Sequence, residues 1–118
     1  MANQTPRLYH NPRCSKSRGA LELLQERGIE PEVVRYLETA PGEEELRALV
    51  GMLGIPARGL LRTGEDEYRS LGLDDPSLGD DDIIAAIARH PKLMERPVFV
   101  HDGRAVIGRP PERVLELL

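Results

Sequence analysis

Residues 8–37 read LYHNPRCSKSRGALELLQERGIEPEVVRYL, and this stretch predicts a strand, a helix and a second strand in succession. The first strand ends at residues 8–10, because Asn11 and the proline after it break the chain into a turn. Apolar residues then recur with helical period over residues 17–28, where a glycine marks the end of the helix. The β-branched and aromatic side chains of residues 33–37 favour a strand that is buried on at least one face.

The rest of the chain is predicted to hold a helical block followed by a hairpin and a last helix. Acidic residues after Pro41 favour a helix start, since they lie near the positive end of the helix dipole. Two short apolar runs flank Asp102-Gly103, a strong hairpin signal. The expected helices are 43–54, 58–62, 80–90 and a last one from Pro110-Pro111 to Leu118, and the expected hairpin strands are 98–100 and 105–107.

This order of elements, β-α-β, helices, β-β-α, defines the fold class. It predicts an α/β protein with a thioredoxin-like fold, in which helices flank a mixed sheet and the β-α-β crossover is right-handed. At 118 residues the chain is long enough for one core and short for two. We therefore expect a single domain over residues 1–118, with a helical insertion at about 42–90.

The composition of the chain limits the cellular compartments and the kinds of partner that we expect. Apolar residues make up 40% of the chain and no apolar run or leader suits a membrane span or a signal peptide, so a cytoplasmic protein is expected. A single cysteine excludes an internal disulfide and favours a reducing compartment. The net charge of −4 argues against nucleic acid as a partner. We expect a monomer that binds neither nucleic acid nor a membrane.

Cys14 lies in a basic loop at the predicted start of a helix. This cysteine loop, residues 10–18, reads HNPRCSKSR and contains three cationic side chains and His10. Positive charge and the unpaired N–H groups of a helix start favour a reactive thiolate, and the same N–H groups bind tetrahedral oxyanions. A buried structural cysteine is the alternative, but the flanking charged residues make poor core neighbours. We expect Cys14 to be a nucleophile.

The sequence argues against three other chemistries. Ser17 stands where a C-x-x-C pair would have its second cysteine, so resolution of a mixed disulfide needs an external thiol. A cysteine phosphatase loop needs arginine six residues after the cysteine, and that position is Ala20. One cysteine and three dispersed histidines offer no ligand spacing for zinc, so no metal site is expected.

Five ordered blocks of the sequence resemble the glutaredoxin-linked, ArsC-type arsenate reductases, especially their shorter bacterial members. The resemblance covers nearly the whole chain. The blocks are residues 10–18 (HNPRCSKSR), 36–39 (YLET), 60–62 (LLR), 91–97 (PKLMERP) and 107–111 (IGRPP).

The resemblance implies a site and a mechanism. Cys14 attacks arsenate, and Arg62, Arg96 and Arg109 bind the oxyanion, a role that suits the bidentate guanidinium fork. Glutathione, as co-substrate, attacks the covalent adduct, and glutaredoxin regenerates the thiol without any bound cofactor. Arg96-Pro97 resembles the cis-proline of thioredoxin folds. The supporting residues of the loop are His10, Asn11, Ser15, Ser17 and Arg18.

Two alternatives of other kinds remain open. One is a glutathione-dependent thiol reductase with a substrate other than arsenate, because cysteine, anion site and glutathione dependence would look the same. The other is a regulatory binding protein that resembles the Spx regulators, which contact RNA polymerase. Those regulators commonly carry C-x-x-C, whereas Ser17 and the complete arginine set favour the enzyme. His10 either promotes the thiolate or shapes the loop by a hydrogen bond.

Overall fold

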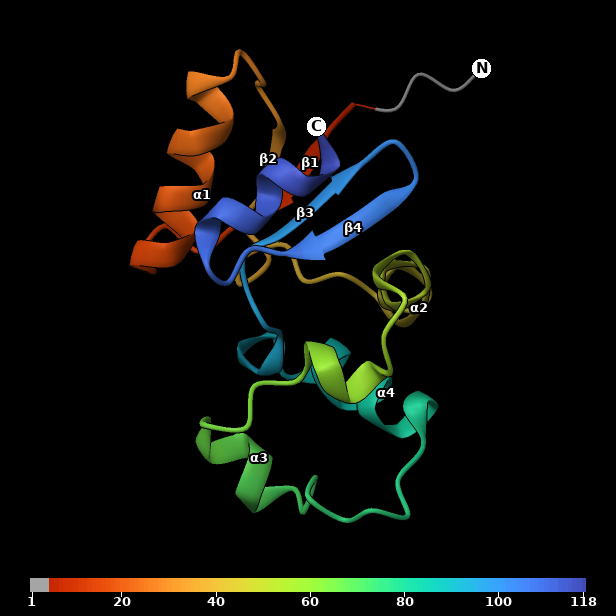
Figure 1. Ribbon diagram of the computed structural model, residues 1–118. Helices are drawn as coiled ribbons and strands as arrows, with labels where there is room; N and C mark the ends of the chain where they lie inside the picture. Colours follow the sequence, from red (N-terminus) through yellow and green to blue (C-terminus); the bar gives the residue numbers. More distant parts are fainter. Residues whose placement is uncertain (1–4) are drawn as a thin grey trace. The chain divides into compact units, whose positions relative to one another are not determined.

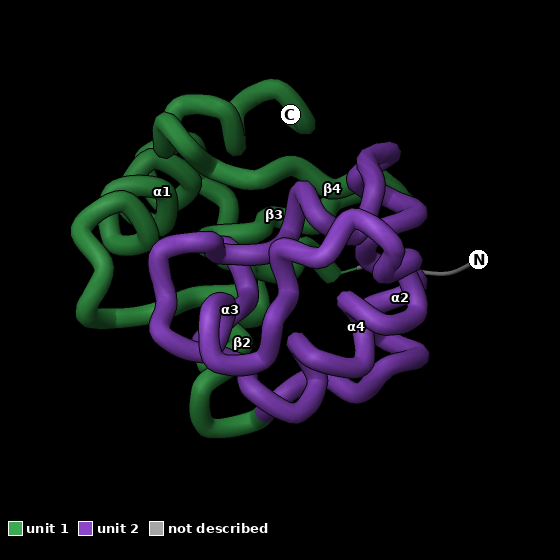
Figure 2. The backbone as a smooth tube through the Cα atoms, turned by 90° about the horizontal axis from the view of Figure 1, so that it is seen from below, with its two compact units in different colours: residues 1–39, 96–118 green, residues 40–95 purple. Residues whose placement is uncertain are grey.

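The computed structural model describes residues 5–118 of the chain (Figure 1). The backbone of this part groups into two compact units (Figure 2). Unit 1 takes the residues up to 39 together with 96–118, and unit 2 takes residues 40–95. The expectation of a single domain stays a prediction.

Unit 1 is built on a four-stranded mixed sheet, as the sequence predicts. The strands β1 (Arg7–Tyr9) and β2 (Glu32–Val34) are parallel and are connected through helix α1 (Ser15–Glu26). Strand β3 (Val98–His101) pairs antiparallel with both β1 and β4 (Arg104–Ile107). The sheet order is β2-β1-β3-β4. This order confirms the predicted α/β class with a β-α-β unit and a hairpin in one sheet.

The hairpin turn lies where Asp102-Gly103 predicts it. Strands β3 and β4 pair in the register Val98 to Ile107 and His101 to Arg104. Asp102 has a φ of 56° and Gly103 a φ of 77°, both in the left-handed region. Two consecutive left-handed residues characterise the type I′ turn, whose twist matches that of the strands it joins.

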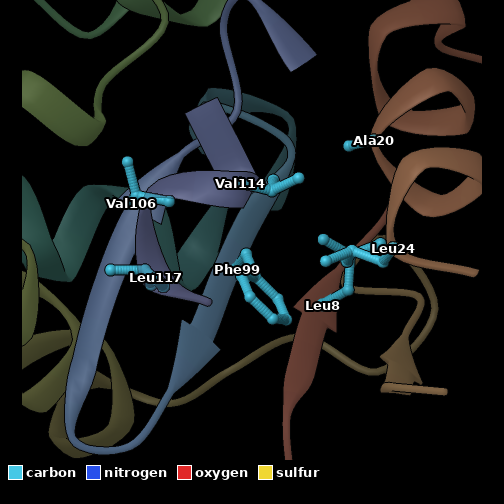
Figure 3. Close-up of a cluster of buried hydrophobic side chains, with 7 residues drawn as sticks. All are labelled: Leu8, Ala20, Leu24, Phe99, Val106, Val114 and Leu117. Carbon is cyan, nitrogen blue, oxygen red and sulfur yellow. The ribbon is translucent and has the colours of Figure 1, made fainter. Parts of the chain in front are cut away.

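The core of unit 1 lies between the sheet and two helical segments, α1 and η3 (Pro111–Leu117) (Figure 3). Figure 1 shows α1 and η3 side by side on the sheet. The last helix was expected to be an α-helix, but η3 is a 3-10 helix. Apolar side chains from the strands, α1 and η3 meet in one cluster. They are Leu8, Ala20, Leu24, Phe99, Val106, Val114 and Leu117.

Unit 2 is the predicted helical block, with two short helices that the sequence did not indicate. Its elements are α2 (Glu43–Leu53), η1 (Ala57–Leu60), α3 (Asp66–Ser70), α4 (Asp80–Arg89) and η2 (Pro91–Leu93). Helices α3 and η2 are too short to show an apolar period, which is why periodicity missed them. An isolated antiparallel bridge joins Leu61, which follows η1, to Met94, which follows η2.

Two predicted boundaries near the site were wrong. Helix α1 begins at Ser15 and not at residue 17, so Cys14 itself is the residue that precedes the helix. Strand β2 ends at Val34 and not at residue 37, because the Arg35 carbonyl accepts the N–H groups of Glu38 and Thr39 and closes a turn. Strand β2 is also the edge of the sheet, and its Val33 is 40% exposed instead of buried.

Candidate functional site

Cys14 is the N-cap residue of α1 and has extended backbone angles. Its carbonyl accepts the N–H of Arg18, while its own N–H donates to the Asn11 carbonyl at 3.0 Å. The thiol is half-buried and makes no capping hydrogen bond. The first N–H groups of a helix have no partner within the helix, and they carry the positive end of its dipole. The single cysteine therefore lies where an anionic sulfur or a bound oxyanion is stabilised.

The shape of the cysteine loop is fixed by hydrogen bonds between uncharged groups. The Ser17 hydroxyl is fully buried and accepts the Asn11 N–H at 3.0 Å. A hydrogen bond of 2.6 Å joins the same hydroxyl to Nδ1 of His10. The Asn11 Oδ1 accepts the N–H of Arg13 at 3.0 Å, which turns the chain toward Cys14. Asn11 and Ser17, both expected as supporting residues, thus hold the loop from its two ends.

His10 lies inside the unit and acts on the loop as a neutral group. It is 5% exposed, and its N–H donates to the Val34 carbonyl at 2.8 Å, at the end of β2. Burial and the positive charges of Arg35 and Arg18 lower the pKa of His10 from its ordinary value of 6.5. A lowered pKa keeps the ring neutral at neutral pH. Of its two candidate roles, the structure favours the hydrogen bond that shapes the loop.

The charged side chains of the loop lie at its surface. Arg13, Lys16 and Arg18 are exposed, and so is Ser15. The Arg18 Nη1 donates to the Pro12 carbonyl at 3.0 Å, so this arginine also braces the turn before Cys14. The sequence of the loop holds no acidic residue. The positive charge that was predicted around Cys14 is therefore present and open to solvent.

Arg96 and Arg109 lie next to one another in unit 1. The Arg109 Nη1 donates to the Arg96 carbonyl at 3.2 Å, and both side chains are half-buried. Each of these arginines precedes a proline, Pro97 or Pro110, in a cis peptide bond. The expectation that Arg96-Pro97 is cis is met, whereas the second cis bond was not anticipated.

Close packing at Gly108 brings this pair of arginines against α1. A Cβ on Gly108 would lie 2.9 Å from Cγ of Pro97 and 3.7 Å from Cβ of Ala20. Pro111 in turn approaches the Cβ position of Gly19 to 3.5 Å. Gly19 and Ala20 belong to the first half of the helix that Cys14 precedes. The segment that carries Arg109 is thus packed on the N-terminal half of the cysteine helix.

Arg62 belongs to unit 2, where two carboxylates hold its guanidinium. Its Nε lies 3.3 Å from Glu65 and its Nη1 lies 3.3 Å from Glu95. The side chain is 20% exposed, and the Arg62 N–H donates to the Leu93 carbonyl at 2.7 Å. Its role beside Cys14 stays a prediction.

A cavity of about 390 Å³ opens beside the cysteine loop. No site role was predicted for its charged wall, although Leu37 and Glu38 belong to the block YLET. Residues 10–13 form one side, and Arg35, Leu37 and Glu38 form the other. The wall belongs to the Arg35 turn, residues 35–39, which directly follows β2. The signal that points to Arg35 is its place after the second strand of a parallel pair, since ligands bind at the carboxyl ends of parallel strands.

Neither a metal cluster nor a membrane helix stands out in the described chain. Within residues 5–118, no three His, Cys, Asp or Glu side chains gather where a metal ion could be held. Over the same residues, no helix is both long and apolar enough to cross a membrane.

Comparison with known proteins identifies relatives that span the whole fold. The model of the ArsC family matches residues 9–117. An arsenate reductase of Neisseria meningitidis serogroup A is 50% identical over 113 residues, which cover 95% of this chain and 97% of the relative. An uncharacterized protein of Escherichia coli K12, YfgD, is 55% identical, with 95% of each chain covered. The solved structure of an arsenate reductase from Vibrio cholerae is 50% identical, with a TM-score of 0.94 over 99% of this chain and all of the other.

Proposed function

This chain belongs to the ArsC family, and on that premise we propose that it is an arsenate reductase, an oxidoreductase that converts arsenate to arsenite with thiols as reductant. The observation that carries the proposal is the position of Cys14. It caps α1 in a loop with three cationic side chains and no carboxylate. A soft nucleophile at a site for tetrahedral oxyanions suits a reaction that begins with attack of sulfur on arsenic.

The first step of the proposed reaction joins Cys14 to arsenic. The thiolate attacks As(V), a sulfur–arsenic bond forms, and one arsenate oxygen leaves as water after protonation. The N–H groups at the start of α1 stabilise the negative charge on the remaining oxygens. Arg96 and Arg109 lie in the same unit and are the proposed guanidinium ligands of those oxygens. Arg62 is the third proposed ligand, and its support is the family pattern of the sequence.

The electrons come from thiols outside the chain, because Cys14 is the only cysteine. We propose that the glutathione sulfur attacks arsenic in the adduct on Cys14 and displaces an oxygen as water. The thiolate of glutaredoxin then attacks the glutathione sulfur, and the disulfide forms as As(V) becomes As(III). Two thiols are oxidised to one disulfide, and the two electrons reduce As(V) to As(III). Water then hydrolyses the remaining sulfur–arsenic bond, which releases arsenite and leaves the Cys14 thiolate ready for another cycle. No bound cofactor takes part in this scheme.

The same scheme places the protein in the cytoplasm, because glutathione and glutaredoxin keep thiols reduced there. Arsenate, glutathione and glutaredoxin are the proposed partners, and a monomer is sufficient for the reaction. Nucleic acid and membranes have no part in it.

The direct test is reduction of arsenate coupled to glutathione, glutaredoxin and glutathione reductase. We expect turnover that depends on a thiol reductant, is fastest with glutathione and glutaredoxin together, and stops when Cys14 is replaced by serine. A mixed disulfide of glutathione is run beside arsenate as a second substrate, with glutaredoxin omitted because glutaredoxin itself reduces such disulfides. Turnover of the mixed disulfide without turnover of arsenate would contradict the proposal and favour a thiol reductase with another substrate.

A further inference from the structure

We propose that the cavity between the cysteine loop and the Arg35 turn binds glutathione, with Arg35 and Arg13 on its carboxylates and Glu38 on its ammonium group. This inference rests on the proposed function, which needs a thiol co-substrate beside Cys14. It goes further by giving that co-substrate a site. Arg35 and Glu38 become specificity residues that no motif around the cysteine indicates.

The position of the cavity in the fold suits a small ligand. Strands β1 and β2 are parallel, and the cavity lies where both end. The His10 N–H bonds to the Val34 carbonyl at 2.8 Å and joins the two strand ends at the base of this region. Crevices at the carboxyl ends of parallel strands are common ligand sites. The volume of about 390 Å³ falls within the range of about 300–1,000 Å³ usual for small-molecule sites.

The charges of the cavity complement those of glutathione. Glutathione carries two carboxylates and one ammonium group at neutral pH. The residues that line the cavity include two arginines, Arg13 and Arg35, and one acidic residue, Glu38. His10 adds no charge there, because its pKa is lowered by burial and by the neighbouring arginines. Leu37 and Pro12 supply apolar surface for the methylene groups of the tripeptide.

The charged side chains of the Arg35 turn are available to a ligand, while the backbone beneath them is fixed. Arg35 Nη1 lies 3.8 Å from the Glu38 carboxylate, and the two side chains are 59% and 69% exposed. An exposed pair at this distance is weak, so each partner can turn to a ligand. The Arg35 carbonyl accepts two N–H groups of the turn, and Tyr36 is buried beneath it at 1% exposure. The backbone of the turn is thus fixed, while the side chains of Arg35 and Glu38 can change conformation to contact a ligand.

Within the cysteine loop, the lining of the cavity ends one residue before the reacting cysteine in the sequence. Arg13, one of its lining residues, directly precedes Cys14. In the proposed step the glutathione thiolate forms a bond to the arsenic held on Cys14, displacing an oxygen that leaves as water. Contacts to the carboxylates and the ammonium group of glutathione, which lie away from its sulfur, orient the glutathione thiol for attack. The binding energy of these remote groups thus lowers the barrier of the step.

The first experiment measures binding without any reaction. S-methylglutathione cannot form a disulfide, and its affinity for the unmodified chain is measured by calorimetry. We expect saturable binding that Arg35→Gln weakens about tenfold, the effect of one charge-assisted hydrogen bond. Arg113→Gln is the matched control, because Arg113 forms a comparable exposed pair with Glu116 in the same unit. Absence of binding, or equal binding by the Arg35→Gln and unmodified chains, would overturn the proposal.

The role of Glu38 is tested by changing the ligand. N-acetylation of S-methylglutathione removes the ammonium group, and the unmodified chain should bind the acetylated form more weakly. Glu38→Gln should bind the two forms alike, since the carboxylate that distinguishes them is gone. An unchanged preference for the free amine in Glu38→Gln would overturn this contact.

Turnover supplies the second readout. With arsenate as substrate, Arg35→Gln should raise the KM for glutathione about tenfold more than the KM for arsenate. The assay is run at about pH 8, where His10 is neutral whether or not Arg35 is present. Turnover driven by β-mercaptoethanol, which has no carboxylate, should respond much less. If the unmodified chain fails to reduce arsenate, the proposed function fails and the binding experiment alone decides this proposal.

Discussion

The cysteine loop and the surroundings of Arg62 hold positive charge in opposite ways. The loop contains three cationic side chains and no acid, and bonds from Asn11 and Ser17 give it its shape. Arg62 instead lies between Glu65 and Glu95, both at 3.3 Å. The positive charge of the loop is open to an incoming anion. The positive charge of Arg62 is instead largely neutralised by its two carboxylate partners. The loop is therefore the region that we propose as a preformed anion site.

The largest expected effect is on the nucleophile of the loop. Cys14→Ser should lower arsenate turnover by at least about 10³-fold, because a hydroxyl at this position is not ionised at neutral pH and cannot replace the thiolate. The thiol is half-buried and caps α1 without a hydrogen bond, so the free energy of unfolding should change by less than about 1 kcal/mol. Steady-state kinetics and urea unfolding measure the two. Retained turnover would remove Cys14 from the mechanism.

The arginines give the next effect, and they sharpen the comparison between the two regions. Arg109→Lys and Arg62→Lys each keep the charge and lose the fork that binds two oxygens. Each should lower kcat/KM for arsenate about 10- to 100-fold. Arg104→Lys is the control, since Arg104 is exposed on β4. A wild-type kcat/KM in Arg62→Lys would show that its two carboxylates, and not the oxyanion, are its partners.

The hydrogen bonds of the loop are tested by Ser17→Ala. This change leaves the Asn11 N–H and Nδ1 of His10 without their shared partner in a buried place. We expect the free energy of unfolding to fall by about 1–3 kcal/mol, measured by urea denaturation. Ser70→Ala is the control, because its hydroxyl is exposed and makes only a long contact of 3.5 Å to Glu67. Equal stability of the two variants would mean that neutral hydrogen bonds do not hold the loop.

Structural features that depend on residues close together in the sequence were predicted better than features that depend on residues far apart. The β-α-β unit and the hairpin turn at Asp102-Gly103 follow from signals within a few residues, and the structure confirms both. The helix beside Cys14 follows from local signals too, although it begins at Ser15 and not at residue 17. The end of β2 was wrong because the turn at Arg35 is made by backbone hydrogen bonds, which leave no periodic pattern.

Features that join distant residues were beyond the sequence. Glu95 lies 33 residues from Arg62, and no spacing rule relates the two. The cavity wall at Arg35 is likewise brought to the cysteine loop by strand pairing between β1 and β2. The bond between Arg109 and the Arg96 carbonyl needs the β3–β4 hairpin to close. Resemblance to a family selected these arginines, because no local pattern in the sequence relates them to one another.

The smallest expected effect concerns the pH dependence of the loop. Burial, Arg35 and Arg18 lower the pKa of His10 in the folded state, while the unfolded chain keeps the ordinary value of 6.5. Above that value neither state binds the proton, and the full stability is present. As the pH falls below it, the unfolded state takes up the proton first, so the free energy of unfolding decreases until the folded pKa is passed. His10→Gln should show a shallower loss of stability between about pH 7 and 5, because its other titrating groups are those of the unmodified chain.

In the unmodified chain, an NMR titration should find the His10 pKa below that of a free histidine, and Arg35→Gln should move it upward. A His10 pKa that does not respond to Arg35→Gln would show that the Arg35 turn and the cysteine loop are electrostatically independent.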